Sequence, residues 1–176
     1  MPIHEAETSQ ETWQKAWQKT LAALPLASFG AGETVFAQGS RTGKLFILDS
    51  GAVSVVKEGT EIARVTECGA IFGELSALLD QPHTADVRTL EPSQFHVADA
   101  ATLLTRDSAA PLYVAMILAQ RVDAANRALL ELKREIDAGE SASVIDSAIG
   151  RIQGLLSAIG DGYMRAGVGL SMFPPG

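Results

Sequence analysis

The sequence predicts a mainly β domain with helices on both sides of it. From Leu26 onward, apolar and polar residues alternate with a period of two, and turn residues recur at short intervals. Before and after this region, apolar residues recur three and four positions apart, which is the spacing of a helix face. A chain of 176 residues suits one such domain and an appendage.

The first predicted element is a helix over residues 9–24, preceded by a loose tail over residues 1–8. Pro25 ends the helix because proline cannot continue the backbone hydrogen bonding. We expect its tryptophans to dock it on the β domain, and a partner-binding helix is the alternative. The residues on its apolar face are Trp13, Trp17, Leu21 and Leu24.

The β region covers residues 26–99. Residues 45–48 form a continuous apolar run, and the turn at residues 58–60 separates two runs rich in valine and isoleucine, as in a β-hairpin. Further strands are expected at Val87 and around Phe95. This pattern is typical of a sandwich or a barrel, and the periodicity alone leaves both open.

Two helices are expected over residues 100–137, a short one to Arg106 and a long one capped by Asp107 or Ser108. Apolar residues on the long helix alternate four and three positions apart, as in a coiled-coil seam. The seam permits a homodimer through helix 112–137, and packing within a single subunit is the alternative. Its residues are Leu118, Val122, Ala125, Leu129, Leu132 and Ile136.

Residues 138–176 are predicted to form a helical extension and a flexible tail. Isoleucine and leucine residues between Ile145 and Ile159 share one helix face, and the tail contains two adjacent prolines. This extension either folds back on the long helix or its dimer mate, or offers a surface to a protein partner whose identity is unknown.

Composition excludes several classes of function. The net charge of −7 argues against a nucleic-acid surface, which needs basic clusters. Cys68 is the only cysteine, and the three histidines are far apart, so the sequence predicts no disulfide, no metal site and no catalytic residues. No apolar run is long enough to cross a bilayer, and no signal peptide is recognisable. We expect a cytoplasmic protein without enzymatic activity and without a cofactor.

One stretch, residues 72–87, combines the groups that bind a phosphorylated ribose. Gly73 has no Cβ, so its backbone can approach a ligand closely, and the amides that follow suit a phosphate. Glu74 accepts hydrogen bonds and does not donate them, so it suits a sugar hydroxyl. Pro82 fixes the backbone before His83 and Thr84, which add a potential cation and a hydroxyl.

This stretch resembles the phosphate-binding cassette of the cyclic nucleotide-binding domain family, in the effector domain of the type found in catabolite activator protein. The family pattern Phe-Gly-Glu-Leu-Ala, followed by Pro-Arg-Ser/Thr/Ala-Ala, is read here at residues 72–76 and 82–85. The resemblance extends over residues 20–137. It implies an eight-stranded double-stranded β-helix, or jelly-roll, barrel within a domain over residues 9–137.

The resemblance also implies the roles of individual residues. Glu74 would accept the ribose 2′-hydroxyl, the backbone around Gly73 would hold the cyclic phosphate, and Asn126 on the long helix could read a base edge. The ligand would be cAMP or cGMP, and Thr84 is compatible with both. The implied ligand-binding residues are Phe72, Gly73, Glu74, Leu75, Ser76, His83, Thr84, Ala85 and Asn126.

His83 departs from the family pattern, because the family has its phosphate-binding arginine at this position. A neutral histidine lacks one charged hydrogen bond, which weakens affinity by about ten- to a hundredfold. If His83 contacts the phosphate, binding should strengthen as the pH falls. A histidine on a surface loop is the alternative.

These observations predict a sensor that binds a cyclic nucleotide and signals through its long C-terminal helix. The alternative is a degenerate domain that acts as a dimeric scaffold or protein-interaction module without nucleotide. The helix-turn-helix domain of the family's transcriptional regulators has no counterpart in residues 138–176, so direct DNA binding is not expected. A membrane partner is not expected either.

Overall fold

The computed structural model describes residues 9–137, and the side chains of residues 14–134. The predicted N-terminal tail and the predicted C-terminal extension lie outside these residues. Four helices are described, α1 (Ser9–Ala23), α2 (Glu74–Leu78), α3 (Ala100–Arg106) and α4 (Ala110–Asp137). The predicted helices at 9–24, 100–106 and up to 137 are thereby confirmed.

Eight strands form two antiparallel sheets of four strands within residues 9–137. The first sheet has the order β1-β8-β3-β6 and the second the order β2-β7-β4-β5. This confirms a mainly β fold with eight strands and a long C-terminal helix. The strands are β1 (Leu26–Phe29), β2 (Thr34–Phe36), β3 (Lys44–Ser50), β4 (Val53–Lys57), β5 (Thr60–Val65), β6 (Ile71–Phe72), β7 (Asp86–Thr89) and β8 (Ser93–Asp99).

Strand β3 explains why the sequence contains a continuous apolar run. Phe46 and Leu48 point into the core between the two sheets, which is centred on Phe95. Leu45 and Ile47 point to the opposite face, where a second core lies under the helices. Because successive strand residues face opposite sides, a strand buried on both faces must be apolar at every position.

The helices cover the outer face of the first sheet. Trp17 of α1 is only 2% exposed, and its ring stacks on Tyr113 of α4 at 4.4 Å between centroids. The Tyr113 hydroxyl donates to the carbonyl of Gly69 at 2.6 Å, which ties α4 to the chain just before β6. The expected docking role of Trp17 is confirmed, whereas the side chain of Trp13 lies outside the described set.

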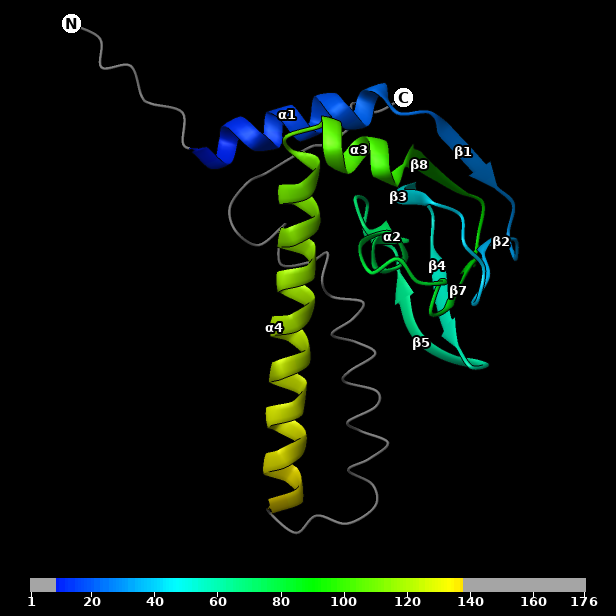
Figure 1. The fold of residues 1–176 in the computed structure, drawn as a ribbon. Coiled ribbons are helices and arrows are strands. Elements are labelled where there is room, and N and C mark those ends of the chain that lie inside the picture. The colour runs from blue at the N-terminus through cyan, green and yellow to red at the C-terminus, as the bar shows by residue number, and fades with distance from the viewer. Residues whose placement is uncertain (1–8, 138–176) are drawn as a thin grey trace, which may run out of the picture.

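Helix α4 begins beside α1 and α3 and runs past the strands (Figure 1). Asp107 caps it by accepting hydrogen bonds from the amides of Ala109 and Ala110, both at 2.8 Å. Beyond the part that packs on the sheet, the predicted seam is largely open, with Val122 and Leu129 exposed. No helix within residues 9–137 has the length and apolarity needed to cross a membrane.

Candidate functional site

A pocket of about 310 Å³ lies beside α2, between the second sheet and α4. This volume falls in the usual range for a small-molecule site. Its apolar wall comes mainly from the second sheet, and its polar lining comes from α2, the segment before β7, the end of β4 and α4. The polar and charged lining residues are Lys57, Glu74, Ser76, His83, Thr84 and Arg121.

Gly73 determines how the chain enters α2. Its φ of +90° lies in the left-handed region, and a Cβ added there would come within 2.5 Å of the carbonyl oxygen of Lys44. A glycine is therefore needed here for the close approach to the backbone of β3, and the close approach to a ligand stays a prediction. The tight turn places the first amides of α2, which have no acceptor within the helix, at the pocket.

Glu74 is 2% exposed, although it is a carboxylate and lines the pocket. Arg121 of α4 donates to its Oε1 and also donates to the carbonyl of Ile71 at 2.8 Å. A buried carboxylate needs such a partner, because desolvation without compensation is costly. The second carboxylate oxygen retains its capacity to accept a hydrogen bond, which is the role that the sequence predicts for this residue.

Arg121 is a residue of this site that sequence reasoning missed. It lies 47 positions after Glu74 in the chain, so no local spacing links the two residues. The available signal was an arginine between Ile117 and Ala124, on the helix face that packs on the domain. A cation on that face indicates a buried acid elsewhere.

His83 is 4% exposed, so the alternative of a surface histidine is wrong. Its ring stacks on Phe36 at 4.0 Å between centroids, and its Nε2 lies 2.9 Å from the hydroxyl of Thr42. Its backbone also pairs with the loop between β2 and β3, through Ser40 and Gly39, at 2.8 Å each. Burial lowers the pKa of His83, which keeps the ring neutral at pH 7.

The remaining predicted residues divide into those at the pocket and one that lies elsewhere. Ser76 lines the pocket, but its hydroxyl donates to the carbonyl of Gln81 at 2.5 Å and so stabilises the cassette itself. Asn126 is exposed on α4 and is not among the lining residues. Those that line the pocket are Phe72, Gly73, Glu74, Leu75, Ser76, His83, Thr84 and Ala85.

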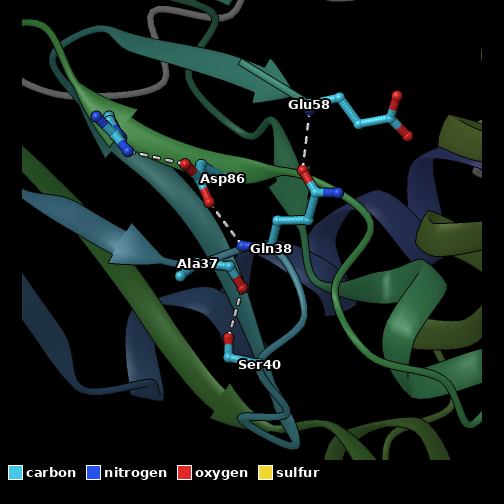
Figure 2. Close-up of polar contacts among 6 residues, drawn as sticks. Ala37, Gln38, Ser40, Glu58 and Asp86 are labelled. Atoms are coloured by element: carbon cyan, nitrogen blue, oxygen red, sulfur yellow. Dashed lines mark hydrogen bonds and ion pairs between the residues drawn. The ribbon is translucent and has the colours of Figure 1, made fainter. Parts of the chain in front are cut away.

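The hairpin of β4 and β5 closes one side of the pocket and is held by the loop after β2 (Figure 2). The backbone amide of Glu58 donates to the side-chain oxygen of Gln38 at 3.0 Å, and the backbone amide of Gln38 donates to the Asp86 carboxylate at 2.6 Å. That hydrogen bond lowers the pKa of Asp86, and Arg88 pairs with the same carboxylate at 2.9 Å. The same loop thus contacts both the hairpin and His83.

Comparison with known families gives one match. Residues 26–105 match the family model described as "Cyclic nucleotide-binding domain". This range contains all eight strands, α2, the loop around His83 and nearly all of α3. It ends before α4, so Arg121 lies outside the matched range.

Relatives and solved structures agree with this match. A curated cGMP-dependent protein kinase from Eimeria tenella is 35% identical over 71 residues, which are 40% of this chain and 7% of the kinase. A crystal structure of a cyclic nucleotide-binding domain from Methylobacillus flagellatus has a TM-score of 0.55 at 21% identity, covering 62% of this chain and 67% of that one. A structure from work on a cyclic-GMP-dependent signalling pathway that regulates bacterial phytopathogenesis has a TM-score of 0.51 at 20% identity, covering 68% and 98%. The two structures establish similarity of fold.

Proposed function

Because residues 26–105 match the model of the cyclic nucleotide-binding domain, we propose that the protein is a non-enzymatic sensor that binds cAMP or cGMP. The ligand occupies the pocket beside α2, and the signal leaves through α4. The ribose binds at Glu74, and the phosphate lies at the backbone turn that begins with Gly73, facing Thr84 and Ala85.

The observation that carries this proposal is the ion pair between Glu74 and Arg121. Glu74 is buried in the wall of the pocket, and Arg121 belongs to α4. A ribose hydroxyl that donates to Glu74 changes the charge density that Arg121 experiences. Binding therefore biases the position of α4, because a ligand shifts an equilibrium by its differential affinity for two conformations.

His83 sets the strength of phosphate binding. The ring is packed on Phe36 and burial lowers its pKa, so it provides no permanent charge at pH 7. The phosphate is held mainly by backbone amides and by Thr84. Protonation of His83 adds one charged hydrogen bond to the phosphate, so affinity increases as the pH falls.

We further propose that the chain forms a homodimer through helix 112–137. Val122, Ala125 and Leu129 are exposed and lie on one stripe of α4. Leu129→Glu should shift the molecular mass in multi-angle light scattering from dimer to monomer. Leu130→Glu is the matched control, because Leu130 is 56% exposed against 59% for Leu129 but lies about 100° around the helix. Equal masses for both variants would contradict this interface.

Calorimetric titration of the purified protein with cAMP and cGMP tests the ligand. We expect saturable binding of a single nucleotide per chain, which Glu74→Ala weakens by at least about tenfold. The control is Glu91→Ala, an exposed glutamate in the turn before β8, which should bind like the unmodified chain. Equal affinity of the two variants would remove Glu74 from the ligand.

The second candidate is a dimeric scaffold or interaction module that binds no nucleotide. It is favoured by one observation, the neutral and buried His83 at the position of the family arginine. In that case Glu74→Ala alters stability only, and neither nucleotide produces heat or a thermal shift at millimolar concentration. The search would then turn to protein partners of residues 138–176.

A further inference from the structure

The pocket contains a third basic side chain that the family pattern does not mark. Lys57 is the last residue of β4 and lines the pocket. Side chains alternate between the two faces of a strand, so Lys57 shares its face with Val53 and Val55. Val53 belongs to the core between the sheets, and Val55 packs against it. This face is the one that turns toward the pocket.

Lys57 differs from the other two basic groups at the pocket, because no described residue accepts a hydrogen bond from its ammonium group. Arg121 is engaged by Glu74, and His83 is neutral and bonded to Thr42. Within residues 9–137, no carboxylate pairs with the Lys57 ammonium, and its side chain is exposed. Its three donors are therefore available to a ligand.

The hairpin that carries Lys57 has a defined turn, and the loop after β2 holds it through a hydrogen bond. Glu58 and Gly59 have φ values of +51° and +81°, as required in the two-residue turn that joins twisted antiparallel strands. The Glu58 amide is held by Gln38, which is itself anchored to Asp86 (Figure 2). A residue next to such a turn is presented at a defined place, which lowers the entropic cost of binding through it.

The base of the ligand lies at this end of the pocket. This step rests on the proposed function, in which phosphate and ribose occupy the turn at Gly73 and Glu74. The rest of the lining is mostly apolar and comes from β4, β5 and β7, including Val55, Ala63 and Val87. Apolar walls suit the faces of a purine, and Lys57 is the charged side chain on this part of the lining.

We propose that Lys57 reads the base edge and makes the site selective for cGMP over cAMP. Guanine presents two acceptors, O6 and N7, along the edge where adenine presents the N6 amino donor beside N7. An ammonium group donates and cannot accept. It therefore gains two acceptors from guanine and faces a like donor on adenine. The expected preference is about tenfold, the lower end for a contact of this kind.

The test is a titration of the intact chain and of Lys57→Met with cGMP, cAMP and cyclic inosine monophosphate. Inosine keeps O6 and N7 but lacks the 2-amino group of guanine, so it isolates the contact made by Lys57. Methionine retains the apolar part of the lysine side chain and removes the charge. Lys19→Met, an exposed lysine of α1, is the matched control.

We expect Lys57→Met to lower the affinity for cGMP and for cyclic inosine monophosphate about tenfold and to change the affinity for cAMP by less than about twofold. The preference for cGMP over cAMP should therefore disappear. Lys19→Met should behave like the unmodified chain. Equal weakening of all three ligands would place Lys57 at the phosphate and overturn base reading. Unchanged affinities for all three nucleotides would show that Lys57 does not contact the ligand. Absence of binding to the unmodified chain would instead overturn the proposed function, and this inference with it.

Discussion

The two sides of the cassette differ in charge: Glu74 has a counterion, whereas His83 is neutral. Glu74 is 2% exposed and has an arginine on α4 as its counterion. His83 is 4% exposed and is instead neutral, with Phe36 against its ring and Thr42 at its Nε2. Both side chains are buried in the wall of the pocket, but only Glu74 contributes a charged group there.

The difference follows from what surrounds each group. A buried charge persists only where another element supplies a counterion, whereas a neutral ring needs packing and one hydrogen bond. The counterion of Glu74 comes from α4, so this side is coupled to the long helix. The partners of His83 come from β2 and the loop after it, so this side is coupled to the β4–β5 hairpin through Gln38.

Gly73→Ala should disturb both sides at once. The new Cβ meets the Lys44 carbonyl and lies 3.5 Å from the His83 ring, at a φ of +90°. We expect a loss of about 3–5 kcal/mol in the free energy of unfolding, measured by urea titration, and loss of nucleotide binding. Gly32→Ala, at a φ of +81° with open space around it, should cost only about 1 kcal/mol. Equal losses would refute the steric role of Gly73.

Arg121→Met isolates the Glu74 side. It leaves a buried carboxylate without its cation, so unfolding free energy should fall by about 3 kcal/mol. Arg127→Met is the control, since it breaks an exposed pair with Asp123 on the same helix and should change stability by less than about 0.5 kcal/mol. Similar losses from both variants would mean that Arg121 contributes as a surface residue does.

His83→Arg isolates the other side by restoring a permanent charge. Affinity for the nucleotide should rise about tenfold, because a guanidinium adds a charged contact to the phosphate. The dependence of affinity on pH between pH 6 and pH 8 should vanish, because arginine does not titrate there. Titration calorimetry at both values measures both effects. Unchanged affinity and a retained pH dependence would place the phosphate away from residue 83.

Gln38→Ala tests the connection between His83 and the hairpin. It removes the acceptor of the Glu58 amide and should cost about 1 kcal/mol in stability. Hydrogen exchange of the hairpin at residues 57–60 should accelerate, while that of α4 should not. Faster exchange in α4 would indicate that the two sides are not separate.

The smallest expected effect is the change of protein stability with pH in the absence of nucleotide. Burial lowers the pKa of His83 in the folded state, so below about pH 6.5 the unfolded chain binds a proton that the folded chain does not. Stability contributed by the neutral ring is therefore complete above this value and decreases as the pH falls. Between pH 7 and pH 5, the midpoint temperature of thermal unfolding should change less for His83→Gln than for the unmodified chain. An identical shift in both proteins would contradict a buried, neutral His83.

Much of the fold could be predicted because its causes are local. The two-residue period, the turn at residues 58–60 and the proline after α1 each determine nearby backbone. The run at residues 45–48 was the less obvious case, because only the two cores on either side of β3 explain why it is apolar throughout. Closure of the sheets into a barrel remains an expectation.

The site was predictable only as far as one stretch of chain determines it. The turn at Gly73 and the position of Glu74 follow from residues 72–76, whereas Arg121 and Lys57 line the pocket from elsewhere in the sequence, and Thr42 contacts His83 from another loop. Asn126 shows that the sequence did not identify which residues of α4 face the pocket. Each residue turns a helix by about 100°, so position 126 lies about 140° around from Arg121, away from the pocket.

Titration of the unmodified protein with cAMP and cGMP at pH 8 tests whether the pocket binds a cyclic nucleotide. At this pH His83 is neutral, so any affinity must come from Glu74, the backbone turn and the rest of the pocket. We expect saturable binding of one nucleotide per chain, with cGMP the tighter ligand. No binding of either nucleotide at millimolar concentration would contradict it and leave the scaffold as the better description.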